Sequence, residues 1–510
     1  MLREAAGPLE TSIFVEGLRA APAGFLGLGL IAHALLWAIA THFAEPAPPP
    51  QMAVALALGR EWFLGYAEMP PLAAWTSETI YRATGSLFAL RLASALCVAL
   101  AGWIVFLFAR RVIGDRQGAI AVLLMVSIFP VAFPGSSLTG DLLLMPLVAA
   151  AFLAWWVAAG EKNPNAWVVL GAILGVTIYA GPQGLVLLVA LAAVTVSSAR
   201  MRAVVARSDA LLSIAFGLFV FGFIAGPRLL WLWQNGWSNL LAGAGAGIAP
   251  GEMISPLRLS FGILLGHFGF ALLVFLATAY AAKEKDNAPV FVREPTALAS
   301  RRGVVALALA PALLALLALY GFDASARLQL FSPLLMLTGI AVVIIGGDRL
   351  IVRRQRFVGA IALIFLFAPP AMQLVFSFAP GWFGENRPAN WPASALARTF
   401  NEIYQTRTGR PLEFVVGERV QASQVSVLSV NRPRVFIDAD RARAPWIDEA
   451  EFKKKGGIVF WQIRGADNAP PQGYVARLPA FTEEAPLRLP WARGGGDPVR
   501  LGWAIVPPAQ

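Results

Sequence analysis

Residues 24–43 read GFLGLGLIAHALLWAIATHF, a run without any Asp, Glu, Lys or Arg. A helix of about 20 apolar residues crosses a bilayer core of about 30 Å, so this run predicts a membrane-spanning helix. Ten further apolar stretches follow before residue 380, and together they predict a mainly α, polytopic membrane protein with about 11 transmembrane helices. These stretches lie near residues 86–108, 118–134, 141–159, 166–181, 183–199, 209–227, 257–281, 303–322, 328–346 and 357–379.

The composition excludes an ordinary soluble protein. The chain is 57% hydrophobic and 14% charged, whereas soluble domains are about 45–50% apolar and about 25% charged. The net charge of +11 resides largely in short loops between apolar runs, so it orients the chain and does not indicate a nucleic-acid partner. Cys97 is the only cysteine, which excludes a disulfide within one chain.

Loop charge predicts the orientation. The segment before the first run mixes acidic and basic residues, unlike a cleavable signal, so we expect an uncleaved first helix. With the N-terminus in the cytoplasm, the inner loops hold 16 basic residues and the outer loops five, which is the asymmetry of the positive-inside rule. An odd number of spans then puts the C-terminus outside.

We expect two domains, a transmembrane domain over residues 1–380 and a small α/β periplasmic domain over residues 381–510. The second part begins with a predicted helix near Trp391–Thr406 and has turn chemistry in between its short β-branched runs. Strands are predicted at Leu412–Glu418, Val425–Val430, Arg434–Asp438 and Gly457–Ile463.

The first outer loop, residues 44–85, is too long for a plain connection between neighbouring helices. Met52–Leu64 and Pro71–Tyr81 predict helices lying in the membrane interface. Between them the chain reads REWFLGYAEMPP over residues 60–71, and its two prolines hold Glu68 in a turn.

Carboxylates on the outer side are candidates for catalysis. A carboxylate within hydrogen-bond reach of a hydroxyl or amine acts as a general base, and Glu68 and Asp141 are the candidate catalytic residues. The alternative for Glu68 is a purely structural turn, and for Asp141 a favourable interaction with a helix N-terminus. Glu61 and Glu78 are expected on solvated helix faces.

Arginines on the same side are candidates for substrate binding, because a guanidinium group binds a phosphate with paired hydrogen bonds. Arg91 lies within the second apolar stretch, where an ionisable side chain indicates function. The alternative for the others is anchoring to lipid head groups. The candidates are Arg82, Arg91, Arg228, Arg258 and Arg327.

The histidines do not predict a metal site. His33, His42 and His267 lack the local spacing that zinc sites use, so each is expected to be structural and no metal is expected.

Six short motifs follow one another along most of the chain. They are GYAEMPPL (65–72), FALRLASAL (88–96), LTGD (138–141), WQNGW (233–237), TGRP (408–411) and PWID (445–448). On these motifs the chain resembles the bacterial GT-C superfamily of membrane glycosyltransferases, in the protein-mannosyltransferase-like class that includes lipid A aminoarabinose transferases.

The resemblance implies a bacterial inner (plasma) membrane protein with its C-terminal domain in the periplasm. It further implies a polyprenyl-phosphate sugar as donor and transfer on the noncytoplasmic face, which agrees with the orientation from loop charge. It also implies a catalytic acidic pair early in the first outer loop, at a set distance before the two prolines. That position falls at Gln51-Met52, where no carboxylate stands, and Met69 replaces a frequent histidine. Asp141 matches an often acidic position and Arg91 a recurrent arginine.

Two functional hypotheses follow. The first is a glycosyltransferase that moves a sugar from undecaprenyl phosphate to a periplasmic lipid A, glycolipid or protein acceptor, with Glu68 or Asp141 as base. The second is a catalytically inactive lipid-binding scaffold or accessory subunit, favoured by the missing acidic pair. A secondary transporter ranks last, because paired halves with interrupted helices are not evident.

Overall fold

The structure is a computed structural model of the 510-residue chain. It describes residues 12–67, 69–133, 135–237, 239–240, 254–278, 289–352, 354–379, 388–463, 468–479, 481–494 and 496–509. Glu68, a candidate catalytic residue, and the predicted domain boundary at residue 380 therefore lie outside the described residues.

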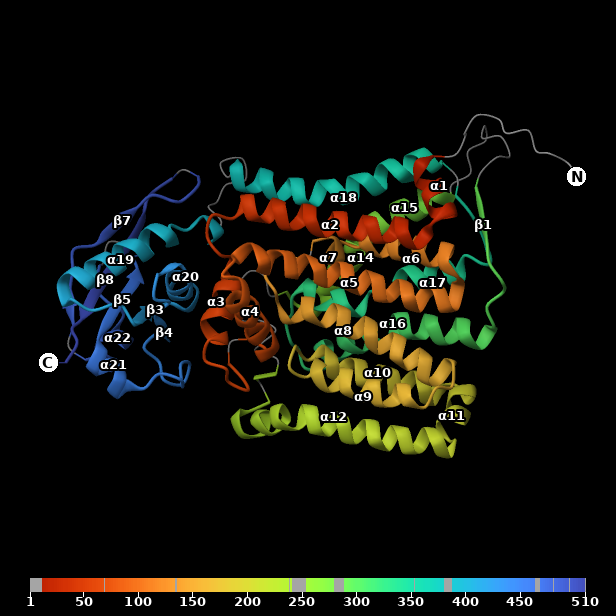
Figure 1. Ribbon diagram of the computed structural model, residues 1–510, viewed down its shortest axis with the longest axis horizontal. Coiled ribbons are helices and arrows are strands. Elements are labelled where there is room, and N and C mark those ends of the chain that lie inside the picture. Colours follow the sequence, from red (N-terminus) through yellow and green to blue (C-terminus); the bar gives the residue numbers. More distant parts are fainter. Residues whose placement is uncertain are drawn as a thin grey trace, which may run out of the picture.

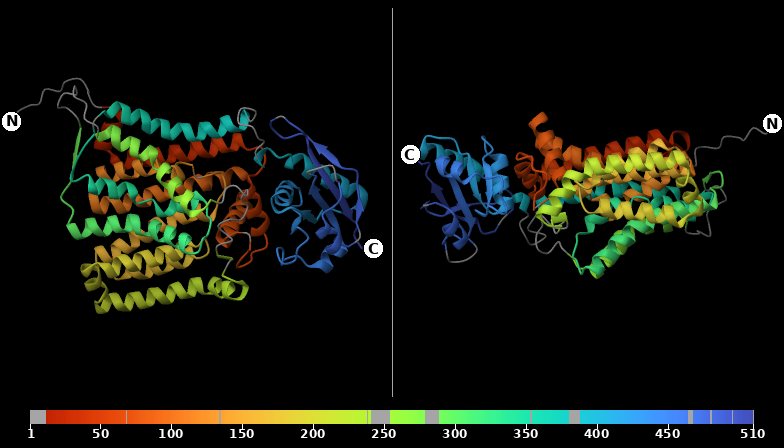
Figure 2. Two further views of the ribbon diagram at one scale, coloured as in Figure 1. Left: turned by 180° about the vertical axis from the view of Figure 1, so that it is seen from behind. Right: turned by 90° about the horizontal axis from the view of Figure 1, so that it is seen from below.

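Long apolar helices lie side by side in one bundle (Figures 1 and 2). Seven of them are long and apolar enough to cross a membrane, which agrees with the predicted class of a polytopic membrane protein. They are α2 (Pro22–Ala44), α5 (Leu87–Ile113), α8 with its π-helical continuation η1 (Gly140–Trp155 and Trp156–Gly160), α12 (Ser208–Asn235), α14 with α15 (Pro256–Gly266 and Phe268–Thr278), α16 (Leu298–Gly321) and α18 (Gln355–Phe378).

Other apolar segments are bent or short. Helix α10 (Gln183–Ser197) meets α11 (Ala199–Val205) at 104°, and the 3₁₀-helix η3 (Leu328–Leu334) meets α17 (Thr338–Ile345) at 56°. Counting each bent pair as one span gives up to nine candidates among the described residues, so the predicted count of eleven is not confirmed. The remaining helices here are α1 (Ile13–Ala20), α6 (Asp115–Val126), α7 (Phe129–Ala132) and α9 (Asn165–Thr177).

The two helices predicted in the first outer loop are present as α3 (Pro50–Gly59) and α4 (Pro71–Thr84). They share a hydrophobic core with the C-terminal part of the chain. In Figure 1 this C-terminal part covers the side of α3 and α4 that faces away from the helix bundle. The expectation of solvated faces for Glu61 and Glu78 is wrong, because this part of the chain buries them. Glu78 is fully buried and binds Arg82 and Arg432, each at 2.7 Å, and Glu61 binds Arg434 at 2.8 Å.

The C-terminal part contains one mixed sheet in the order β4-β3-β5-β8-β6, with β7 also paired to β8. Strands β3, β4 and β5 are parallel where they pair, and β8 runs antiparallel to β5, β6 and β7. The elements are η5 (Pro388–Asn390), α19 (Ala393–Thr408), β3 (Phe414–Gly417), α20 (Arg419–Leu428), β4 (Arg434–Ile437), α21 (Glu449–Lys455), β5 (Gly457–Gln462), α22 (Gln472–Arg477), β6 (Thr482–Glu483), β7 (Leu487–Leu489) and β8 (Val499–Val506).

The predicted small α/β architecture is therefore present, but one predicted strand is wrong. Residues Val425–Val430 contribute to helix α20, which ends at Leu428. Parallel strands need a crossover connection, usually a helix, and α20 supplies it between β3 and β4. At the opposite end of the bundle, β1 (Val290–Val292) and β2 (Arg349–Ile351) form a short antiparallel pair.

Candidate functional site

A cavity of about 460 Å³ lies where the membrane helices meet the first outer loop. It is lined by the end of α2, the start of α3, the turn before α8, the start of η3 and one residue of α18. Its polar lining residues are Glu45, Gln51, Ser136, Ser137, Thr139, Asp141, Arg327, Gln329, Ser332 and Gln373. Two carboxylates and a guanidinium group thus line one cavity.

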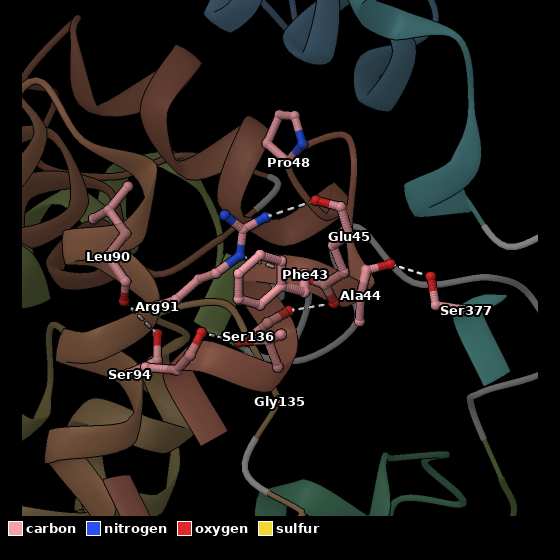
Figure 3. A network of polar contacts seen from close by, with 12 residues as sticks. Phe43, Ala44, Glu45, Pro48, Leu90, Arg91, Ser94, Gly135, Ser136 and Ser377 are labelled. Atoms are coloured by element: carbon pink, nitrogen blue, oxygen red, sulfur yellow. Dashed lines mark hydrogen bonds and ion pairs between the residues drawn. The ribbon is translucent and has the colours of Figure 1, made fainter. Parts of the chain in front are cut away.

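Glu45 is the first residue after α2, and its backbone N–H still bonds to the Thr41 carbonyl at 3.1 Å. Ser136 donates its hydroxyl to Glu45 Oε1 at 2.7 Å, and Arg91 Nε lies 3.5 Å from Oε2. Arg91 also donates from Nη2 to the Glu45 backbone carbonyl at 3.2 Å. Figure 3 shows Arg91 and Ser136 reaching Glu45 from different elements, so its carboxylate has a fixed position.

Asp141 lies in the first turn of α8, where the helix dipole favours a negative charge. Its Oδ2 lies 2.9 Å from Arg327 Nη2, and its Oδ1 accepts a hydrogen bond from Gln183 Nε2 at 2.6 Å. The preceding Gly140 permits this arrangement, because a Cβ there would lie 2.0 Å from the carbonyl oxygen of Ala180. The start of α8 therefore lies against the turn that leads into α10.

The arrangement combines two chemical abilities. A carboxylate at a cavity wall accepts a proton from a bound hydroxyl or amine, and an arginine beside it binds a phosphate oxygen. Both carboxylates are paired with arginines, Glu45 with Arg91 and Asp141 with Arg327. Three glutamine amides and several hydroxyl groups line the rest of the polar surface and can bind sugar hydroxyls.

The structure brings three of the sequence candidates together and separates the others from them. Asp141 and Arg327 line the cavity, and Arg91 contacts Glu45 at its edge. Arg82 does not line the cavity; it pairs with Glu78, and its side chain is 54% exposed. Arg258 is exposed on α14 and is likewise not among the cavity-lining residues.

Arg228 has a structural environment beside the motif 60–71. Its guanidinium lies 4.5 Å from the centre of the Trp231 ring and donates to the Leu64 carbonyl at 3.3 Å. A Cβ at Gly65 would lie 2.0 Å from Arg228 Nη1, so the motif requires a glycine there. Arg228 therefore supports this loop, and it does not line the cavity.

The described residues of the motif 60–71 pack against other parts of the protein, and none of them lines the cavity. The Tyr66 hydroxyl donates to the Leu58 carbonyl at 2.8 Å and accepts from the Phe63 N–H at 2.9 Å. Burial raises the pKa of Tyr66 above its ordinary value, so the hydroxyl stays protonated and remains a donor. Of the histidines, His33 is buried within α2, and no group of three metal-ligating side chains occurs among the residues that the structure describes.

Sequence analysis missed Glu45. The acidic position expected at a set distance before the prolines falls at Gln51, which lies inside α3, six residues after Glu45. The available signal was simpler, because Glu45 is the first carboxylate after the first apolar run. In the structure it lies early in the first outer loop, where the resemblance implied an acidic residue.

Comparisons with known proteins agree with this geometry. Residues 68–231 match the family model of dolichyl-phosphate-mannose-protein mannosyltransferases. The crystal structure of ArnT from Cupriavidus metallidurans bound to undecaprenyl phosphate is similar over 96% of this chain and 100% of that chain, with a TM-score of 0.52 and 16% identity. The chain shares the fold of ArnT. The predicted resemblance is thereby confirmed as a sequence match over residues 68–231 and as a similarity of fold over nearly the whole chain.

A more distant similarity involves the Archaeoglobus fulgidus oligosaccharyltransferase in complex with zinc and sulfate. It covers 84% of this chain and 68% of that chain, with 11% identity and a TM-score of 0.41. Among curated proteins, no relative matches the sequence. Arg91 and Asp141 lie within the segment that matches the family model, whereas Glu45 and Arg327 lie outside it.

Proposed function

We propose that the protein is a membrane glycosyltransferase that moves a sugar from a polyprenyl-phosphate carrier to an acceptor at the periplasmic surface of a bacterial plasma membrane. The observation that carries this proposal is the cavity in which Glu45 and Asp141 lie beside Arg91 and Arg327. ArnT, whose fold the chain shares, was crystallised with undecaprenyl phosphate, which supports a lipid of this class as the carrier.

The proposed reaction is a single displacement at the anomeric carbon. The acceptor oxygen or nitrogen forms the new bond, while the bond from the anomeric carbon to the phosphate oxygen breaks. The phosphate leaves with the electron pair, and inversion follows from attack on the opposite face. Arg327 stabilises the charge that develops on the phosphate, and Arg91, which is not among the cavity-lining residues, holds Glu45.

Glu45 is the proposed general base. It follows the C-terminal end of α2, where the helix dipole opposes a negative charge, whereas Asp141 lies at a helix start that favours one. Glu45 also lies on the cavity wall, where a bound acceptor can reach its carboxylate. Asp141 has each oxygen bonded to a separate partner, Arg327 or Gln183, and its proposed role is to orient Arg327.

The proposed site changes the roles assigned from sequence. Glu68 lies outside the described residues, so its role as an alternative base stays a hypothesis. The acceptor is a lipid A, a glycolipid or a protein, as predicted, and the proposed orientation has the N-terminus in the cytoplasm and residues 381–510 in the periplasm. The scaffold hypothesis rested on the missing acidic pair, and Glu45 removes that argument for it.

The test is transfer by purified protein from a panel of polyprenyl-phosphate sugars. We expect Glu45→Gln to lose about 10²–10⁴-fold in turnover, the usual contribution of a general base, and Asp141→Asn to lose less. The matched control is Glu161→Gln, because Glu161 pairs with Arg111 on the exposed opposite side of the bundle. Retained lipid binding without turnover on any donor would instead support the scaffold hypothesis.

A further inference from the structure

The short segment that carries Glu45 is held from outside by the C-terminal part of the chain. This segment, residues 43–48, comprises the last two residues of α2 and most of the connection to α3. Arg493 Nη1 donates to the backbone carbonyls of Phe43 at 2.5 Å and Ala44 at 3.2 Å. On the other side of Glu45, the buried Gln424 donates from Nε2 to the Pro48 carbonyl at 2.8 Å.

We propose that Arg493 and Gln424 are positioning residues that fix the Glu45 carboxylate against the cavity. The inference rests on the proposed function, because it assigns a role in that reaction to residues that do not line the cavity. It makes the C-terminal domain part of the catalytic unit, although that domain begins 336 residues after Glu45.

The Arg493 contacts satisfy a general need of helix ends. The last four carbonyl groups of a helix have no partner within the helix, and a basic side chain there also interacts favourably with the helix dipole. Ser377 of α18 donates a short hydrogen bond to the Ala44 carbonyl as well (Figure 3). Arg493 lies 3.2 Å from the Ser377 hydroxyl and 4.3 Å from the centre of the Phe378 ring, so it ties the ends of α2 and α18 together.

Because of its sequence, contacts made to the backbone of this segment also fix the position of the Glu45 carboxylate. Residues 45–50 read EPAPPP, and prolines restrict the backbone so strongly that the segment has few alternative conformations. Arg91 and Ser136 bind Glu45 from the membrane side. Two sets of contacts therefore hold Glu45. Arg91 and Ser136 bind the residue itself, and Arg493 and Gln424 bind backbone carbonyl groups on either side of it.

We expect the C-terminal domain to stay attached when Arg493 is removed, which makes the proposal testable. Separate ion pairs attach this domain to the first outer loop, from Arg432 to Glu78 at 2.7 Å and from Arg434 to Glu61 at 2.8 Å. A variant at Arg493 thus changes the contact with the Glu45 segment and leaves these attachments in place.

The experiment uses the full chain in lipid nanodiscs, with kcat and KM measured for a polyprenyl-phosphate sugar that the wild type turns over. A displacement of about 1 Å at a reacting group costs up to about 10²-fold. We therefore expect Arg493→Ala to lower kcat by about 10-fold to 10²-fold with little change in KM, and Gln424→Ala to act in the same direction. Arg493→Lys should recover part of kcat, because lysine retains a donor.

The matched control is Arg488→Ala, which removes the same charge from an exposed position on β7. It should leave kcat within about twofold, as expected for a surface change away from the reacting groups. An Arg493→Ala variant that equals this control, or that changes KM alone, would overturn the positioning role.

Hydrogen–deuterium exchange separates failure of this inference from failure of the proposed function. Peptides covering residues 43–47 should exchange faster in Arg493→Ala than in the wild type, whether or not any sugar is transferred. Unchanged exchange there would overturn the inference even if the enzyme is active. If the wild type has no transfer activity but the variant exchanges faster, the proposed function is refuted. Arg493 then makes a structural contact and does not position a catalytic group.

Discussion

The two ends of the helix bundle contain similar ion pairs in different surroundings. At the outer end, Arg327 pairs with Asp141 on the wall of a cavity. At the opposite end, Arg293 and Arg301 each lie 2.9 Å from Asp348 Oδ1, and Gln117 donates to the backbone carbonyls of Phe291 and Asp348. The second cluster fastens the β1–β2 pair to α6.

The difference shows why a charge near a membrane surface is weak evidence of a site. Polar groups buried among helices need partners wherever they occur, so pairing alone does not separate structure from function. What distinguishes the outer end is that Glu45, Asp141 and Arg327 also line a space of about 460 Å³. Arg293 Nη1 instead donates to Gln117 Oε1 at 2.7 Å, and Gln117 donates to the Phe291 carbonyl.

The largest effect within this comparison is expected at Arg327. Arg327→Ala removes a group proposed to stabilise the departing phosphate, and loss of one such donor costs about 10²–10³-fold in kcat. Turnover per folded molecule is the quantity to measure, because Asp141 loses its ion-pair partner as well. Arg258→Ala, an exposed arginine on α14, is the control and should stay within about threefold, as expected for a surface change.

An intermediate effect is expected at Asp348, and it concerns stability. Asp348→Asn removes the charge that faces Arg293, whose side chain is only 4% exposed. Leaving a buried polar group poorly satisfied costs about 1–3 kcal/mol, so thermal unfolding in detergent should occur at a lower temperature. Turnover per folded molecule should be unchanged, and a loss of kcat comparable to that of Arg327→Ala would contradict the contrast between the two ends.

The smallest effect is expected at Arg111, whose ion pair with Glu161 is exposed on both sides, at 43% and 40%. Exposed pairs contribute about 0–1 kcal/mol. Arg111→Ala should therefore leave both the unfolding temperature and turnover close to those of the wild type. A clear fall in the unfolding temperature or in turnover would mean that this end of the bundle does more than hold neighbouring elements together.

Apolar length was sufficient to predict a helical membrane domain, and turn chemistry predicted the α/β part after it. Asp141, Arg327 and Arg91 could be found because a charged residue at the edge of an apolar run is conspicuous. The sequence could not show that residues 419–428 form a crossover helix, since their β-branched residues also suit a strand. It could not exclude Arg82, Arg228 and Arg258 either, because tertiary contacts decide which arginines reach the cavity.

Glu45 and Glu78 illustrate the remaining gap. Glu45 was missed because a set spacing from the prolines was assumed, and the length of a loop is free to vary while the ends of its helices stay in place. Glu78 was expected in water because helical periodicity describes one helix at a time. Its burial arises from Arg432, which is 354 residues away in the chain.

The central claim is that the outer cavity is where a lipid-linked sugar reacts. A structure of the full chain with a polyprenyl-phosphate sugar bound would test it most directly, through the distances from the phosphate to Arg327 and from the anomeric carbon to Glu45. We expect the phosphate oxygens within hydrogen-bond distance of Arg327 and the sugar inside the cavity facing Glu45. A donor bound with its phosphate at Arg82 or Arg258, away from both carboxylates, would contradict the account.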